Sequence, residues 1–172
     1  FLGRRLMQRV PVVRLGRTEL RVSKLGFGEF DFGVEDPYHL GPKEGWRTLT
    51  EAFKLGINFW DSTDDYDAHP IGAHAIRLLP RKELVISFKT SARDDRSALK
   101  SLNGYLRELG TDYIDVIMLH CVESSWKGYP KMLKELEKIK NSGLARAIGL
   151  STHSVKVVKQ ASEIEEVDVI LT

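Results

Sequence analysis

The sequence is poor in cysteine, since Cys121 is the only one among its 172 residues. A single cysteine excludes an intrachain disulfide. No Cys/His pair has the spacing of zinc ligands, so we expect no metal site. Both absences are typical of proteins in a reducing compartment, and we expect a cytoplasmic protein. We interpret Cys121 as a small, packed thiol.

Long apolar runs are also absent. No stretch approaches the roughly 20 apolar residues needed to cross a bilayer, and the basic residues 1–9 lack the apolar core of a signal peptide. We therefore expect no membrane partner. The chain begins with Phe1 rather than Met, so we expect it to start inside a longer gene product.

A charge of one sign does not dominate the sequence. Lys and Arg number 26 and Asp and Glu number 24, giving a formal net charge of +2, and the two signs are interleaved. This balance excludes the basic surface of a nucleic-acid-binding protein. The hydrophobic fraction of 42% and the charged fraction of 29% are those of a globular protein. A chain of this length suffices for one domain with a real core.

The main positive feature is an alternation of short apolar runs with amphipathic segments. Most of the apolar runs are almost continuously hydrophobic, which is typical of parallel strands buried on both faces. The six predicted strands cover residues 24–28, 58–61, 84–89, 113–120, 147–151 and 167–171.

Helical patterns lie between these strands. The predicted helices cover residues 45–55, 72–79 (the weakest), 96–109, 130–141 and a segment that follows Ser154. Asp94 or Asp95 can cap the third helix, and Gly110 ends it. Residues 12–15 and 18–22 are predicted to form a β-hairpin before the first parallel strand. We expect residues 1–11 to be an extension and residues 12–172 to be one domain.

Two architectures contain such βα repeats: an open doubly wound sheet and a closed (β/α)8 barrel. The glycines in residues 26–33 superficially match a dinucleotide fingerprint, but that fingerprint must open a helix directly. Here the next helix is expected only near Lys43, so the sequence favours the barrel.

In a barrel, reactive residues sit at the carboxyl ends of the strands. The predicted strands end at Gly28, Asp61, Lys89, His120 and Ser151. Singly, the Asp could cap a turn and the His could be a satisfied core residue. Buried charged groups are costly unless paired, however, so packing alone explains the whole set poorly.

Four segments resemble the aldo-keto reductase family: residues 55–66, 85–90, 109–120 and 143–151. In that family an Asp ends the second strand and a Tyr follows five residues later, as Asp61 and Tyr66 do here. The segment that ends in His120 is the most specific match. The resemblance runs from about Val12 to the end of the chain. It implies an α/β fold, a (β/α)8 TIM barrel of which this chain holds about the first six βα units.

The resemblance implies reduction of an aldehyde or ketone with hydride from NADPH. Tyr66 would donate the proton to the carbonyl oxygen. Lys89 would favour the phenolate of Tyr66, Asp61 would pair with Lys89, and His120 would orient the carbonyl. The expected partner is a small carbonyl substrate.

The resemblance also indicates residues that border the cofactor and the substrate. The expected cofactor-binding residues are Gly28, Glu29, Phe30, Asp61, Ser151 and His153. Ser151 matches a Ser that contacts the carboxamide. The family commonly follows that Ser with Asn, and His153 is the candidate substitute. Phe30 and Trp126 are candidate walls of the substrate pocket, although Trp126 could instead cover helix ends.

A full barrel of this type takes about 250 residues, and six strands cannot close one. We therefore expect the chain to be incomplete at its C-terminus. In the family, the later segments hold the pyrophosphate and the 2′-phosphate of NADP(H), so we expect this chain alone to bind NADP(H) poorly. Three alternatives remain: a reductase-like binding or regulatory subunit, an inactive fragment, and an aldolase with Lys89 as Schiff base.

Overall fold

A computed structural model of the chain describes residues 9–28, 41–65 and 69–172. Three of the predicted site residues, Glu29, Phe30 and Tyr66, lie outside these ranges. Within them, no helix is long and apolar enough to span a membrane.

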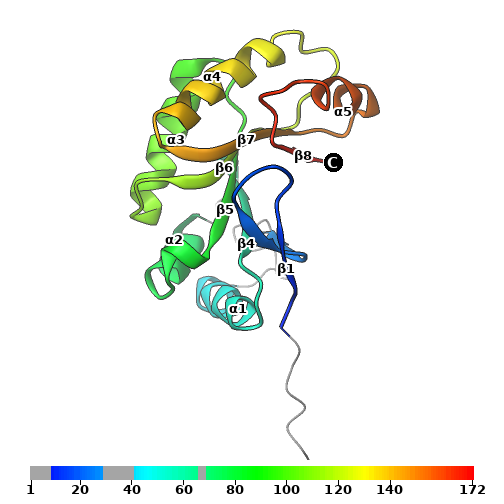
Figure 1. The fold of residues 1–172 in the computed structure, drawn as a ribbon. Coiled ribbons are helices and arrows are strands. Elements are labelled where there is room, and N and C mark those ends of the chain that lie inside the picture. Colours follow the sequence, from blue (N-terminus) through cyan, green and yellow to red (C-terminus); the bar gives the residue numbers. More distant parts are fainter. Residues whose placement is uncertain (1–8, 29–40, 66–68) are drawn as a thin grey trace, which may run out of the picture.

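The centre of the molecule is a curled parallel sheet of six strands (Figure 1). The strands are β3 (Gly26–Gly28), β4 (Phe59–Thr63), β5 (Val85–Thr90), β6 (Ile114–Leu119), β7 (Ala145–Ser151) and β8 (Val169–Leu171). Each strand pairs in parallel with the next one in the sequence, so their order in the sheet is their order in the chain. A doubly wound sheet reverses its strand order at a switch point, whereas a barrel does not. The predicted barrel architecture is confirmed as a six-stranded half-barrel.

The helices cover the convex side of the sheet (Figure 1). They are α1 (Pro42–Lys54), α2 (His69–Arg77), α3 (Asp95–Leu109), α4 (Tyr129–Asn141) and α5 (Val155–Ala161), with a short 3-10 helix, η2 (Arg81–Glu83), before β5. Every predicted helix is present.

The local signals at the helix ends explain both the agreements and the differences. Asp94 caps α3 by accepting a hydrogen bond from the Ser97 N–H at 2.9 Å. Gly110 ends that helix at φ 67°, a conformation that glycine adopts without strain. Helices α1 and α2 begin three residues before their predicted starts. Pro42 is the first residue of α1, because a proline fits the first turn of a helix.

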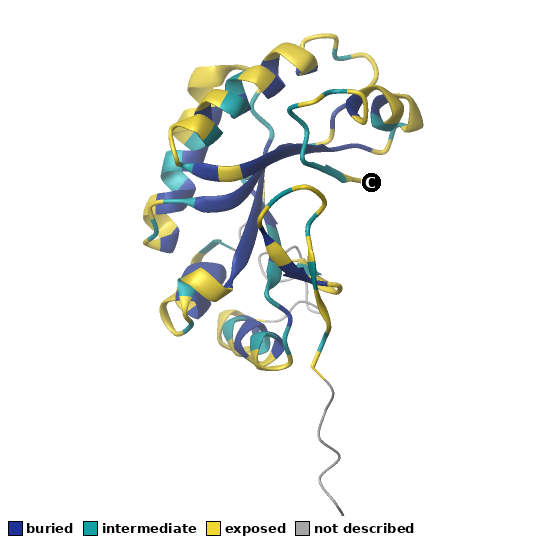
Figure 2. Ribbon diagram, in the orientation of Figure 1, coloured by how far each residue is buried: buried dark blue, intermediate teal, exposed yellow. Residues whose placement is uncertain are grey.

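Side chains pack on both faces of the central strands β5, β6 and β7, which are buried almost throughout, whereas the edge strands β3 and β8 are half-buried or exposed (Figure 2). On the convex face, alternate strand residues such as Trp60, Phe88 and Ile117 contact the helices. On the concave face, Val85, Val116 and Met118 contact the hairpin. This double burial is the physical reason why the strands read as continuous apolar runs.

The predicted hairpin is confirmed as β1 (Val12–Arg14) paired with β2 (Arg21–Ser23). It lies on the concave side of the sheet (Figure 1) and buries Leu20 and Val22 there. The side chain of Asn58 fixes it by accepting a hydrogen bond from the Ser23 N–H at 2.7 Å. The hairpin therefore covers part of the concave side of the half-barrel and shields its inward apolar residues from water.

Asp168 ties the hairpin to the far edge of the sheet. Its carboxylate accepts hydrogen bonds from Lys140 at 2.7 Å, the Ile148 N–H at 3.1 Å and Arg17 of the hairpin turn at 3.3 Å. Burial by itself raises the pKa of Asp168. These donors outweigh burial, so the pKa of this carboxyl lies below its ordinary value.

Gly149→Ala should disrupt the pairing of β7 with β8. A Cβ at this position would lie 2.1 Å from the backbone oxygen of Val169, and overpacking of this kind costs about 1–3 kcal/mol. Gly104→Ala is the matched control, because a Cβ there meets nothing within 4 Å and glycine weakens a helix interior by about 0.5–1 kcal/mol. Urea denaturation should give opposite signs for the two variants. A neutral Gly149→Ala would contradict the pairing.

Asp168→Asn should reduce stability at neutral pH and flatten its acid dependence. A carboxyl with a depressed pKa stabilises the fold above the unfolded-state pKa of about 3.9 and loses that contribution as the pH falls through the folded-state pKa. Urea denaturation between pH 7 and pH 3 measures this. Asp112→Asn, at an exposed position, controls for the lost charge. Equally steep acid limbs in wild type and Asp168→Asn would contradict the role of Asp168.

Candidate active site

The side chains predicted at the strand ends point to the concave side of the sheet. Successive side chains of a strand point to opposite faces, so residues two or four apart point the same way. The residues Phe59, Val85, Met118 and Ala147 pack on the concave side. Two or four residues further along the same strands lie Asp61, Lys89, His120 and Ser151, which therefore point the same way. The sheet therefore collects all four predicted side chains on the concave side, at one end of the half-barrel.

Lys89 and Asp61 form the buried ion pair that the sequence predicts. Lys89 Nζ donates a hydrogen bond to Asp61 Oδ2, and its side chain is only 4% exposed, against 28% for Asp61. An ammonium ion at this depth requires a counter-charge. In this structure the Lys89 side chain thus has the carboxylate partner that the resemblance implies.

Two polar atoms beside this pair have no partner among the described residues. Asp61 Oδ1 and Ser87 Oγ are both buried, and the two residues face each other in the register of β4 and β5. Both residues line a cavity of about 560 Å³ on the concave side, together with Gly28. Buried polar groups are nearly always satisfied in folded proteins. The two atoms are therefore open to hydrogen-bonding groups from outside the described residues.

His120 follows β6 and contacts the end of β4. Its backbone N–H donates to the Thr90 oxygen at 2.9 Å. Its ring Nδ1 lies 3.1 Å from Thr63 Oγ1 and 3.2 Å from Asp65 Oδ2. The side chain is 15% exposed. The structure therefore brings the predicted histidine to the segment that also carries Asp61.

Asp64 is a connecting residue that the sequence analysis missed. Its carboxylate accepts hydrogen bonds from the Thr90 hydroxyl at 2.6 Å, the Ser91 N–H at 3.0 Å and the Ser101 hydroxyl at 2.7 Å. Its own N–H donates to the Lys89 oxygen at 3.0 Å. Asp64 thus joins the ends of β4 and β5 to α3 and fixes the backbone that carries Lys89. The signal available in the sequence is the acidic pair directly after a buried strand.

Ser151 lies where the sequence predicts, at the buried end of β7. Its hydroxyl oxygen accepts a hydrogen bond from the Cys121 N–H at 2.9 Å. The hydroxyl hydrogen has no acceptor among the described residues, so it can be donated to an amide oxygen such as that of a carboxamide. His153 is exposed, beyond the turn that leaves β7. The interpretation of Cys121 as a packed thiol is wrong, because this residue is exposed.

Trp126 contacts a different part of the molecule. The guanidinium of Arg93 lies 4.4 Å from the centre of its ring, and Tyr129 at the start of α4 lies 6.5 Å away, centre to centre. Trp126 shares a small hollow with the first residues of α3 and α4 and does not line the cavity of Asp61. These contacts match the alternative given above, an aromatic side chain that covers helix ends.

Gly28 ends β3 directly beside Asp61, with which it pairs in register. A Cβ at Gly28 would meet none of the described residues within 4 Å. Glu29 and Phe30 follow it outside the described residues, as does Tyr66. Within the described ranges, no group of three or more His, Cys, Asp or Glu side chains is arranged to hold a metal ion.

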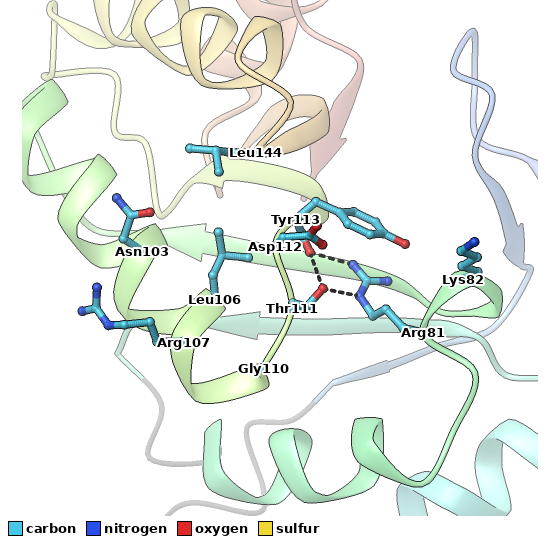
Figure 3. Close-up of a pocket in the computed structure, with 10 residues that line it drawn as sticks. All are labelled: Arg81, Lys82, Asn103, Leu106, Arg107, Gly110, Thr111, Asp112, Tyr113 and Leu144. Atoms are coloured by element: carbon cyan, nitrogen blue, oxygen red, sulfur yellow. Dashed lines mark hydrogen bonds between the residues drawn. The ribbon is translucent and has the colours of Figure 1, made fainter.

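A second hollow, of about 760 Å³, lies on the outer side near η2 (Figure 3). Arg81 lines this hollow and donates hydrogen bonds to Thr111 Oγ1 at 3.3 Å and to the backbone oxygen of Tyr113 at 3.0 Å (Figure 3). Arg81 also pairs with the buried Asp115 at 2.8 Å. This arginine therefore holds the loop before β6 in place. None of the predicted site residues lines this second hollow.

A family model described as "Aldo/keto reductase family" matches residues 24–171. An L-galactose dehydrogenase from Arabidopsis thaliana is 29% identical over 162 residues, which cover 84% of this chain and 49% of that protein. An NADH-specific methylglyoxal reductase from Escherichia coli is 26% identical, with 95% of this chain and 58% of that protein covered. The chain thus spans about half the length of the curated relatives that it matches.

Solved structures of aldo-keto reductases have a similar fold. A thermostable aldo-keto reductase in complex with the inhibitor epalrestat superposes with a TM-score of 0.80 at 26% identity, covering 93% of this chain and 61% of that one. A holo aldo-keto reductase from Bacillus halodurans superposes with a TM-score of 0.83 at 23% identity, covering 94% and 57%. The half-barrel therefore has the architecture of the first part of these barrels.

Asp61→Asn should destabilise the fold, because it leaves the Lys89 ammonium buried without its carboxylate. Breaking a fully buried pair costs about 3–5 kcal/mol, and the partial exposure of Asp61 should reduce the loss to roughly 2–3 kcal/mol. The double variant Asp61→Asn/Lys89→Met should recover part of this loss, because no buried charge remains. Urea denaturation of the two single variants and the double variant measures the coupling. Simple additivity would contradict an energetically coupled pair.

Proposed function

The chain belongs to the aldo/keto reductase family, and on that premise we propose that it carries the proton-transfer part of a reductase of aldehydes or ketones. The observation that carries the proposal is the buried Lys89–Asp61 pair beside His120, at one end of the half-barrel. Packing requires no such arrangement, since burying charged groups at inward positions costs free energy that apolar side chains would not.

The proposed acid is Tyr66, which follows Asp65 directly in the chain. Asp65 Oδ2 lies 3.2 Å from Nδ1 of the His120 ring. A free tyrosine has a pKa of about 10, and a neighbouring ammonium ion favours its phenolate. Lys89 is the cation proposed for that purpose, with Asp61 as its counter-charge. His120 would hydrogen-bond the carbonyl oxygen and orient it towards the acid.

The proposed cofactor is a nicotinamide dinucleotide, which supplies the hydride when bound. Three features of this chain fit it. The Ser151 hydroxyl has a hydrogen to donate to the carboxamide, the buried Asp61 Oδ1 can accept from a ribose hydroxyl, and a Cβ at Gly28 would meet none of the described residues within 4 Å. We propose NADP(H), with NADH as the alternative, because one relative is named as NADH-specific.

The proposed substrates are small carbonyl compounds. The printed names of the relatives include a reductase of methylglyoxal, which is a small aldehyde, and a dehydrogenase of a sugar. The described cavity is lined largely by apolar side chains, among them Phe59, Met118 and Ile170. A neutral carbonyl compound fits that lining better than a strongly charged one does.

The test is oxidation of NADPH and of NADH with a small aldehyde, using the protein as its gene encodes it. Tyr66→Phe should lower kcat by about 100-fold or more, the usual contribution of a general acid, while leaving cofactor binding intact. Tyr113→Phe is a matched control, because it removes the same hydroxyl group from a tyrosine that stacks on Arg81 in the second hollow, away from the predicted site residues. Unchanged activity in Tyr66→Phe would refute the acid assignment. A folded protein that oxidises neither cofactor would instead favour a binding or regulatory role.

A further inference from the structure

We propose that His69 is a positioning residue whose ring ties the start of α2 to the last residue of β4, and so holds both ends of the short segment that carries Tyr66. The tie itself follows from the contacts of His69. Its consequence for catalysis rests on the proposed function, in which Tyr66 is the acid.

The tie is a hydrogen bond from the ring of His69 to the backbone of β4. Nε2 of His69 lies 2.7 Å from the backbone oxygen of Thr63, the last residue of that strand. A carbonyl oxygen only accepts hydrogen bonds, so Nε2 must carry a proton and donate it. This holds for the neutral ring and for the imidazolium alike. The two residues are 6 positions apart in the chain, so one hydrogen bond fixes both ends of the segment between them.

Neighbours on α3 and β5 hold the ring in the orientation that this bond needs. Nδ1 of His69 lies 2.9 Å from Glu108 Oε2 near the end of α3, and this contact is an ion pair when the ring carries both protons. The ring also meets Tyr105 at 4.7 Å and Phe88 at 6.3 Å, centre to centre, with its plane tilted steeply to theirs. Edge-to-face contacts of this kind are favourable. The His69 side chain is only 14% exposed, so these contacts rather than water fix its orientation.

The strand end that His69 holds is the one that carries the candidate site. The hydroxyl of Thr63 lies 3.1 Å from Nδ1 of His120. Two residues earlier on the same strand is Asp61, which pairs with Lys89. A shift of the backbone at Thr63 would therefore be felt by side chains from three strand ends.

Fixing both ends of a short segment limits the conformations that it can adopt. A general acid must stand within hydrogen-bond reach of the atom that it protonates, and a displacement of about 1 Å can cost about 100-fold in rate. Loss of the tie should therefore lower kcat. The groups proposed to contact the cofactor, on Asp61 and Ser151, make no contact with His69, so binding of the cofactor should persist.

The first experiment is kinetic and uses the protein as its gene encodes it, with a small aldehyde as substrate. His69→Phe keeps a ring between the same aromatic neighbours but has no N–H, so kcat should fall by about tenfold or more while KM for the cofactor stays within about twofold. His69→Gln can still donate from its amide and should recover most of kcat. His74→Ala is the matched control, because it removes an exposed histidine of the same helix, and it should change neither constant.

The order of the two variants separates the hydrogen bond from packing. A packing role alone would favour Phe over Gln, since a second ring fills the space of the first. An unchanged kcat in His69→Phe, or a lower kcat in His69→Gln than in His69→Phe, would overturn the proposal. A general loss of structure would weaken cofactor binding together with kcat, and that result would overturn it as well.

The second experiment needs no substrate. Long-range ¹⁵N–¹H NMR of the wild type should show a proton on Nε2 of His69 throughout the range from pH 5 to pH 9, and loss of the signal in His69→Gln identifies it. The Asp64 N–H donates to the Lys89 oxygen just beyond Thr63, so its hydrogen exchange should become about tenfold faster in His69→Phe, with no change at Val116 in the middle of β6.

The two experiments fail in different ways. A ring of His69 without a proton on Nε2, or unchanged exchange at Asp64 in His69→Phe, would overturn the tie itself. The expected NMR and exchange results in a protein that reduces no carbonyl would instead refute the proposed function and leave the tie intact.

Discussion

The side-chain alternation of parallel strands is the constraint on which this structure depends. Inward positions recur at every second residue of a strand, and along each strand their character changes from apolar to polar. The earlier inward positions pack on the hairpin, as with Val85 and Met118. Polar side chains follow at the carboxyl ends, with Lys89 on β5 and His120 after β6. A one-residue shift of any strand would turn its polar group towards the helices, so the folding of the core and the assembly of the site are a single requirement.

The three aspartates near the end of β4 show how position assigns different roles to one residue type. Asp61 points inward and meets the Lys89 ammonium. Asp64 binds hydroxyl and amide donors of β5 and α3, so it fixes the backbone. Asp65 is more exposed and reaches the ring of His120. A carboxylate buried with an ammonium ion, one satisfied by neutral donors and one in water differ in charge environment, although they lie within five residues.

Apolar runs and helical periodicity predicted the strands, the helices and the place of Asp61, Lys89, His120 and Ser151 at strand ends, because those features depend on neighbours a few residues away. Contacts between distant segments were not predictable in the same way. The partners of His120 come from the end of β4, 55 and 57 positions away, and no local pattern specifies such a pairing. The exposure of Cys121 follows from its backbone, since a residue at φ 48° leaves the strand direction. A place for Trp126 in the substrate pocket was predicted from its position in a loop. In the structure, Trp126 instead contacts Arg93, a residue distant in the sequence.

Buried polar atoms distinguish a functional interior from one that is only packed. A folded chain rarely leaves a buried acceptor or hydroxyl unpaired, because the loss of hydration costs about 1–3 kcal/mol for each group. Within the described ranges, Asp61 Oδ1 and Ser87 Oγ are both in that state, in register with each other and lining one cavity. Ser62 Oγ, on the helix-facing side of β4, is in the same state. The missing hydrogen-bonding groups must come from outside the described ranges, and under the proposed function a bound cofactor would supply the one at Asp61 Oδ1.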